Sequence, residues 1–186
     1  MRVEFLGTGT STGVPMIGCR CDVCRSKDSR DRRLRSSVCL TVDDKNILID
    51  CGPDFRQQML RSGIDHIDAV LLTHEHYDHT SGLDELRNFS RNNPIPIYAE
   101  PNVLDIIHQR LFYCFSEQPN PGVAHLELKA IENLSPFTLF GIDIEPVRVW
   151  HYRLPIIGYR IGRFAYITDM LTLSLIHISE PTRHLR

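Results

Sequence analysis

The sequence predicts a layered α/β fold with mixed sheets, and two observations carry this prediction. In the first half of the chain, short runs of β-branched residues alternate with runs of helical spacing. From residue 125 to residue 150 the chain instead holds two or three alternating strands, interrupted at Ser135-Pro136 and at Gly141. Strands and helices in this order favour sheets covered by helices, but the spacing alone leaves the topology open.

Turn and cap residues set the bounds of the expected elements. The turn-forming run 43–46 lies between two apolar segments and predicts a hairpin. Pro53 and Gly63 are start and stop signals around a short helix. The glycines of residues 7–13 end the first strand, because glycine allows the backbone to turn tightly. The expected strands are residues 3–6, 38–42, 47–49, 67–72, 95–98 and 164–168, and the expected helices are residues 54–62, 83–89 and 103–111.

The composition is that of an ordinary globular domain. The chain has 186 residues, of which 42% are hydrophobic and 24% charged, and its net charge of -2 gives no global attraction to nucleic acid or to an anionic membrane. No apolar stretch approaches the roughly 18–20 residues that span a bilayer, and no signal-peptide hydrophobic region is present. We therefore expect a cytoplasmic protein without a membrane segment.

The last sixteen residues differ from the rest of the chain. Residues 171–186 (LTLSLIHISEPTRHLR) have no clear period and follow abruptly on the expected strand 164–168. We expect residues 1–170 to form one domain that is incomplete at its C-terminus, and residues 171–186 to be a non-native tail. A diverged genuine terminus is the alternative. His177 and His184 are not assigned as ligands.

A histidine cluster is the strongest signal in the sequence. His74 and His76 lie two residues apart, so their imidazoles can point the same way from an extended turn, and Asp78 and His79 add a carboxylate and a third imidazole. Imidazole and carboxylate suit zinc, manganese or iron. The alternative is a polar surface turn with accidental histidines, but three histidines and an aspartate within six residues favour a metal site.

Three of the six cysteines form a second cluster. Cys19, Cys21 and Cys24 are close enough in sequence to hold one zinc ion, with a fourth position left for a distant residue. Disulfides are disfavoured by the absence of an export signal. The cluster therefore predicts a structural zinc, whereas the remaining cysteines are expected to be small buried thiols.

The run from residue 25 to residue 35 contains six basic and two acidic residues. Such a run can attract phosphate groups, but a solvated loop is the favoured interpretation. Because the run lacks interleaved aromatic residues and a wider basic face, nucleic acid is not an expected partner.

The histidine cluster resembles the signature His-x-His-x-Asp-His of the metallo-β-lactamase superfamily, matched in full by residues 74–79. Residues 5–10, 49–52 and 82–83 are similar to the phosphodiesterase branch that contains tRNA 3′-processing endonucleases and phosphoribosyl cyclic phosphodiesterases. The cysteine cluster resembles the latter, PhnP-like group. The resemblance covers residues 1 to about 170 and implies an αββα sandwich of two mixed sheets, with its second half incomplete.

Further site residues follow only from the resemblance. His151, seven residues before Gly158, matches the histidine that completes the first metal site, and Asp169 matches the aspartate that bridges both metals. Taken alone, His151 is more often a packed histidine and Asp169 a strand-end cap. Asp50 is expected to orient a ligating histidine by accepting a hydrogen bond from its other ring nitrogen, or else to act as a cap.

The resemblance implies a metal-dependent phosphodiesterase with two divalent ions, zinc or manganese, and one structural zinc. A cyclic ribose phosphate is the favoured small substrate, and a homodimer is possible. The alternatives are tRNA 3′ processing, thioester or lactam hydrolysis, and a non-catalytic zinc-binding fragment, since the family's final histidine ligand has no match. The ligand set consists of His74, His76 and His151 for one ion, Asp78 and His79 for the other, and Asp169 as the bridge, with Asp78 and Asp169 as catalytic carboxylates.

Overall fold

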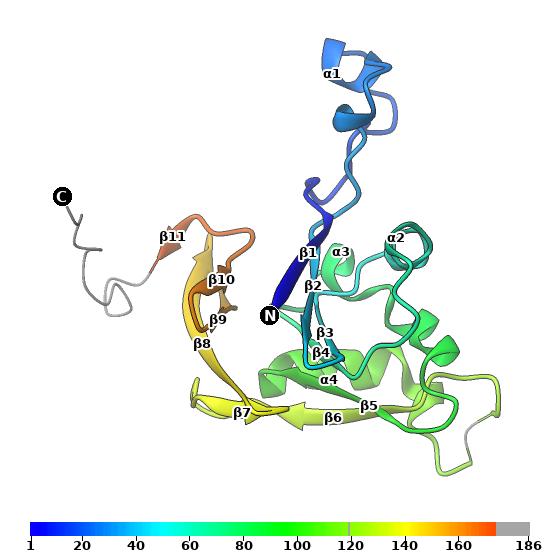
Figure 1. Ribbon diagram of the computed structural model, residues 1–186, viewed down its shortest axis with the longest axis vertical. Helices are drawn as coiled ribbons and strands as arrows, with labels where there is room; N and C mark the ends of the chain where they lie inside the picture. Colours follow the sequence, from blue (N-terminus) through cyan, green and yellow to red (C-terminus); the bar gives the residue numbers. More distant parts are fainter. Residues whose placement is uncertain (119, 174–186) are drawn as a thin grey trace. The chain divides into compact units, whose positions relative to one another are not determined.

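The computed structural model describes residues 1–118 and 120–173. The chain divides into two compact units, Met1–Ile131 and Glu132–Arg186, shown in Figure 1. Most of the expected non-native tail, residues 174–186, lies outside the described residues. The domain bounds predicted from the sequence stay a prediction.

The first unit is built on a six-stranded mixed sheet. Its strand order is β1-β2-β3-β4-β5-β6, antiparallel from β1 to β3 and parallel from β3 to β6. The predicted hairpin is confirmed: Asp43 and Asp44 both have positive φ, as in the type I′ turn that often joins two twisted strands. The strands are β1 (Arg2–Gly7), β2 (Ser37–Val42), β3 (Lys45–Ile49), β4 (Ala69–Leu71), β5 (Ile95–Ala99) and β6 (Leu126–Ala130).

Helices of the first unit pack their apolar residues into one core with this sheet. Phe55, Leu86 and Ile107, from three different helical segments, are buried in the same cluster as Leu48 and Ile97 from the strands. The α-helices are α1 (Asp22–Arg25), α2 (Phe55–Ser62), α3 (Tyr77–Thr80) and α4 (Pro101–Arg110), and the 3-10 helices are η1 (Ser29–Asp31), η2 (Leu83–Asn88) and η3 (Phe112–Cys114).

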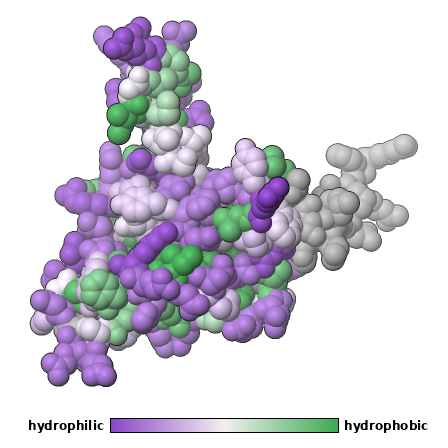
Figure 2. All heavy atoms as spheres, turned by 180° about the vertical axis from the view of Figure 1, so that it is seen from behind, coloured by the Kyte–Doolittle hydropathy of each residue, from purple (hydrophilic) through white to green (hydrophobic). Residues whose placement is uncertain are grey.

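Several short helical segments differ from expectation. The segment expected as a helix at residues 83–89 is the 3-10 helix η2, in which Leu83 and Leu86 are buried. A spacing of three places both leucines on one face of a 3-10 helix, so the sequence pattern does not separate the two helix types. The α1 and η1 turns were not expected, and they lie in a segment that extends beyond the end of β1 (Figure 1). Figure 2 shows hydrophilic side chains at the tip of this segment and apolar side chains exposed next to them.

The second unit contains an antiparallel sheet in its described part. Strand order is β10-β9-β8-β11, with β7 also paired to β8. Strand β9 was missed because Pro155 and Gly158 break the sequence pattern. Gly158 is needed for close packing, since a Cβ there would lie 2.8 Å from the carbonyl oxygen of Tyr166. The strands are β7 (Phe137–Leu139), β8 (Ile142–His151), β9 (Leu154–Ile161), β10 (Phe164–Tyr166) and β11 (Thr172–Leu173).

The predicted α/β class with two sheets is confirmed, and parallel pairing occurs within the sheet of the first unit. Among the described residues, no helix combines the length and apolar character needed to cross a bilayer.

Candidate metal centre

The histidine cluster lies where two neighbouring parallel strands end. Strand β3 leads into Asp50, and β4 leads through Leu72 into Thr73 and the histidine loop. The carboxyl ends of parallel strands meet at one edge of the sheet, so residues 23 positions apart in sequence become neighbours. His74 and His76 lie on the loop, which gives way at Tyr77 to the single turn of α3.

Three imidazole rings gather on this loop. The centroid of the His74 ring lies 4.6 Å from that of His76 and 4.3 Å from that of His79. His74 and His79 are fully buried, at 0% and 1% exposure, and His76 is half-buried. One ring nitrogen each of His74 and His76 lie within 4.8 Å of one another, close enough to bind the same ion. The structure therefore brings together the first-unit histidines that the sequence singled out.

The Asp50 carboxylate holds this loop in place. Its Oδ1 accepts hydrogen bonds from the backbone N–H of Thr73 at 2.9 Å and from the Thr73 hydroxyl at 3.0 Å. Its Oδ2 lies 2.7 Å from Nδ1 of His79. Asp50 has no exposed surface, so its charge depends on these donors for stabilisation. The contact between Asp50 and Nδ1 of His79 is the one that Asp50 needs in order to orient a ligating histidine, as expected from the sequence.

The hydrogen bonds around Thr73 determine which nitrogen of His74 carries its proton. The Thr73 hydroxyl has one hydrogen and donates it to Asp50, so it accepts the hydrogen bond from Nδ1 of His74, 2.9 Å away. His79 likewise donates from Nδ1 to the carboxylate. Both rings then carry the proton on Nδ1 and offer Nε2 as a ligand atom.

The donor set fits a divalent cation. Nε2 of His79 lies 3.2 Å from Oδ2 of Asp78. Because the His79 proton is on Nδ1, the lone pair of Nε2 faces a carboxylate oxygen. Two acceptors at this distance repel one another unless a proton or a cation lies beside them. Imidazole nitrogen next to carboxylate oxygen is a ligand combination that zinc and manganese accept.

Close backbone packing fixes the loop from both sides. A Cβ on Gly52 would lie 2.0 Å from the carbonyl oxygen of Asp78, and a Cβ on Gly82 would lie 2.2 Å from that of Gly52. These positions accept only glycine because the chain segments touch backbone to backbone. The backbone N–H of Cys51 also donates to the carbonyl oxygen of His79 at 2.8 Å.

Arg110, at the end of α4, is a positioning residue that the sequence did not reveal. Its Nη1 donates to the carbonyl oxygen of Glu75 at 2.6 Å and to the Thr80 hydroxyl at 3.3 Å. Thr80 in turn donates to the carbonyl oxygen of His76 at 2.9 Å. No local pattern marks these contacts, because Arg110 and Glu75 are 35 residues apart.

His151 and Asp169 belong to the second unit. His151 is the last residue of β8, and its ring centroid lies 5.6 Å from that of Tyr152. Asp169 follows β10 with φ of 50° and accepts a hydrogen bond from the Thr168 hydroxyl at 3.2 Å. Left-handed backbone at a non-glycine residue is uncommon and often occurs at functional sites. That His151 and Asp169 bind the same metal ions as the histidine loop stays a prediction.

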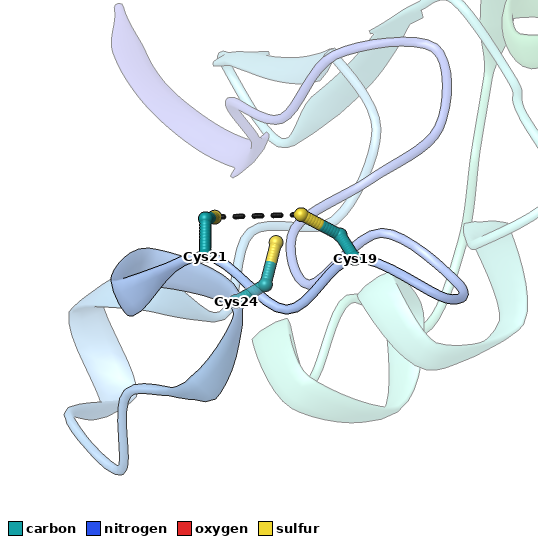
Figure 3. A group of neighbouring side chains, drawn as sticks. All are labelled: Cys19, Cys21 and Cys24. Carbon is teal, nitrogen blue, oxygen red and sulfur yellow. Dashed lines mark hydrogen bonds between the residues drawn. The ribbon is translucent and has the colours of Figure 1, made fainter.

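The three clustered cysteines direct their sulfurs toward one another (Figure 3). The Sγ atoms of Cys19 and Cys21 lie 3.4 Å apart, and those of all three residues lie within 4.8 Å of one another. Cys24 Sγ accepts a hydrogen bond from the backbone N–H of Met16 at 3.4 Å. This arrangement, three sulfurs with a backbone donor, suits a tetrahedral zinc ion.

The thiols of this cluster influence one another's protonation. The backbone N–H of Cys24 and the side chain of Cys19 lower the pKa of Cys21. The pKa of Cys24 is raised: the Met16 N–H acts to lower it, but hydrogen bonding with Cys19, desolvation and the neighbouring thiols together outweigh that donor. Thiolates crowded together compete for protons, and a bound dication relieves this competition.

The isolated cysteines are chemically different from the cluster. Burial raises the pKa of Cys39 to about 12 and that of Cys51 well above its usual value. Such thiols are inert at neutral pH. The expectation of small buried thiols is confirmed for these residues and for Cys114.

Comparison with known families shows which family this chain belongs to. The model of the beta-lactamase superfamily domain matches residues 45–180. The chain belongs to the beta-lactamase superfamily. The resemblance found in the sequence is thereby confirmed, and the match includes the histidine loop and both second-unit candidates.

Three similar proteins belong to differently named groups. An octanoyltransferase of Porphyromonas gingivalis is 53% identical over 171 residues, covering 91% of the chain. A diphosphatase of the PhnP family has 42% identity and a TM-score of 0.80 over 88% of the chain. Zinc-bound PqqB of Methylobacterium extorquens has 26% identity and a TM-score of 0.65 over 89% of the chain.

Each of these three relatives is longer than the segment that this chain matches. The chain covers 35% of the octanoyltransferase and 63% of each of the two solved chains. A name given to the whole octanoyltransferase therefore describes a protein of which about two thirds has no counterpart in this chain.

Replacing Asp50 with asparagine tests the orientation of the histidine loop. Asp50→Asn should weaken zinc binding about 10-fold to 100-fold, because partners of ligating histidines contribute that much to affinity. Competition with a chelator measures this, in a chain whose clustered cysteines are serines so that bound zinc reports on the histidine loop. Asp105→Asn, an exposed change on α4, is the control. Equal zinc affinity in folded Asp50→Asn and Asp105→Asn proteins would remove Asp50 from this role.

Proposed function

We propose that the chain is the metal-binding part of a phosphodiesterase that hydrolyses a cyclic ribose phosphate or a related phosphodiester. The observation that carries this proposal is the likeness to the PhnP-family diphosphatase, at 42% identity and a TM-score of 0.80. The histidine loop adds the donor set that phosphoryl chemistry with divalent ions requires. Hydrolysis at phosphorus is thus favoured over the other reactions of the fold.

Two divalent ions, zinc or manganese, are the proposed cofactors. When bound, such ions lower the pKa of a water molecule, neutralise phosphate oxygens and stabilise the leaving oxygen. The proposed ligands of one ion are His74, His76 and His151, those of the other are Asp78 and His79, and Asp169 is the bridging carboxylate.

The protein's own residues prepare this chemistry in three ways. Asp50 and Thr73 fix the imidazoles so that Nε2 faces outward from their hydrogen bonds. Burial of His74 and His79 removes competing water from the ligand atoms. We assign Asp78 as a catalytic carboxylate together with Asp169, because its Oδ2 lies beside a ligand nitrogen and can accept a proton from the attacking water.

A structural zinc is proposed for the cysteine cluster, with Cys19, Cys21 and Cys24 as its ligands. Changing all three to serine should remove one zinc equivalent per chain, because serine hydroxyls do not replace thiolates as zinc ligands. Elemental analysis of purified protein measures the loss, and Cys114→Ser, at a buried cysteine, should retain full zinc content. An unchanged zinc content in the triple variant would exclude this site.

Two other reactions compete with the proposed one. The 53% identity to a protein named octanoyltransferase favours testing an octanoyl thioester as substrate. The tRNA 3′-processing reaction remains the alternative within phosphodiester chemistry, and a non-catalytic zinc-binding fragment is the alternative outside enzymology. Cytoplasmic location and a homodimer stay predictions.

A substrate panel tests the proposal directly. We expect the metal-loaded protein to hydrolyse a cyclic ribose phosphate and a generic nitrophenyl phosphodiester in preference to an octanoyl thioester or a β-lactam. Because the chain covers 63% of its solved relatives, a version as long as those relatives is assayed beside it. Asp78→Asn should lower kcat at least about 100-fold, consistent with loss of a metal ligand and proton acceptor, whereas Asp105→Asn should leave it unchanged. Preferential thioester hydrolysis, or no turnover by the longer version, would contradict the proposal.

A further inference from the structure

A hollow of about 420 Å³ in the first unit is lined by arginines from two separate parts of the chain. We infer that this arginine hollow binds single-stranded nucleic acid. None of its lining residues is a proposed metal ligand, so the inference does not depend on the proposed phosphodiesterase activity. The residues that carry the argument are Phe5, Arg30, Arg32, Arg33 and Arg61.

Charge in the hollow is only partly compensated. Asp28 pairs with Arg30 at 2.6 Å, so one guanidinium has a counterion. Arg33 donates to the carbonyl oxygen of Arg30 at 3.3 Å, and Arg61 donates to that of Leu6. Within the described part of the chain, Arg32, Arg33 and Arg61 have no carboxylate partner. Three like charges that share one hollow repel one another, and an anion held between them removes that repulsion.

The backbone that carries these arginines is fixed in advance. Arg33 and Val14 exchange backbone hydrogen bonds at 2.8 and 3.0 Å. Gly7 lies against the same segment so closely that a Cβ there would be 1.8 Å from the carbonyl oxygen of Arg35. Arg61 comes from the last turn of α2 and is the fourth arginine that lines the hollow. A backbone that is already fixed does not have to be ordered when a ligand binds, so only the arginine side chains lose conformational freedom.

The chemistry of the lining identifies the ligand. Guanidinium groups match phosphate oxygens bidentately, and the hydroxyls of Thr8 and Ser29 in the same lining are further donors. Phe5 also lines the hollow and is 60% exposed, so its ring offers a face on which a base can stack. Sites that bind single-stranded nucleic acid combine basic side chains along the nucleic-acid backbone with an exposed aromatic ring for the bases.

This ligand differs from the sequence expectation for a physical reason. The run from residue 25 to residue 35 lacked an aromatic residue and a wider basic face. The fold supplies both, because β1 brings Phe5 and α2 brings Arg61 to the same hollow. Neither residue is near the run in sequence.

Fluorescence anisotropy with a labelled oligothymidylate of about 12 nucleotides tests the inference on the full chain. Arg32→Ala/Arg33→Ala should weaken binding about 10-fold and make the slope of log K against log salt shallower by about 1.4, from about 0.7 per lost phosphate contact. Both side chains are exposed, so the variant should fold. Arg163→Ala, an exposed arginine in the second unit, is the matched control and should bind normally.

Two further variants separate the base from the phosphate and the hollow from the metal centre. Phe5→Leu should weaken oligonucleotide binding several-fold, whereas Phe5→Trp should preserve it, because only an aromatic ring stacks with a base. Asp78→Asn should lose turnover but keep oligonucleotide affinity. Oligonucleotide affinity that is unchanged in Arg32→Ala/Arg33→Ala would overturn the inference. Polyphosphate of equal charge that competes equally well, together with no effect of Phe5→Leu, would overturn nucleic acid as the ligand.

Discussion

The histidine loop depends on one buried carboxylate. Asp50 has no exposed surface, and its charge is stabilised by the backbone N–H and hydroxyl of Thr73 and by Nδ1 of His79. A buried carboxylate is costly unless such donors compensate it. The backbone of Asp50 is itself left-handed, with φ of 61°, and this conformation aims the side chain under the loop. The same three donors therefore pay for the buried charge and set the ligand geometry.

Packing around this carboxylate makes the site rigid before any ion binds. The Ser37 hydroxyl donates to the backbone carbonyl of Asp50 at 2.8 Å, and Gly52 touches the backbone of Asp78. Arg110 holds the outer side of the loop through the carbonyl oxygen of Glu75. A metal centre needs this support, because ligands held only by flexible loops lose affinity when they must be ordered at the time of binding.

The sequence predicted local features well because their causes are local. The hairpin turn at Asp43-Asp44, the helix between Pro53 and Gly63 and the ligand types of residues 74–79 can all be derived from neighbouring residues. Contacts over long separations could not be derived, and these include the Arg110 anchor and the meeting of Arg61 with the basic run. His151 and Asp169 were assigned only through family resemblance, since a strand-end histidine or aspartate carries no signal of its own.

Asp50 and Thr73 set the tautomers of His74 and His79. Long-range ¹H–¹⁵N NMR of the imidazole rings in zinc-loaded protein measures this directly, because it shows which ring nitrogen carries the proton. We expect His74 and His79 both to carry a proton on Nδ1 and to bind zinc through Nε2. A proton on Nε2 of either ring, with zinc bound, would contradict it.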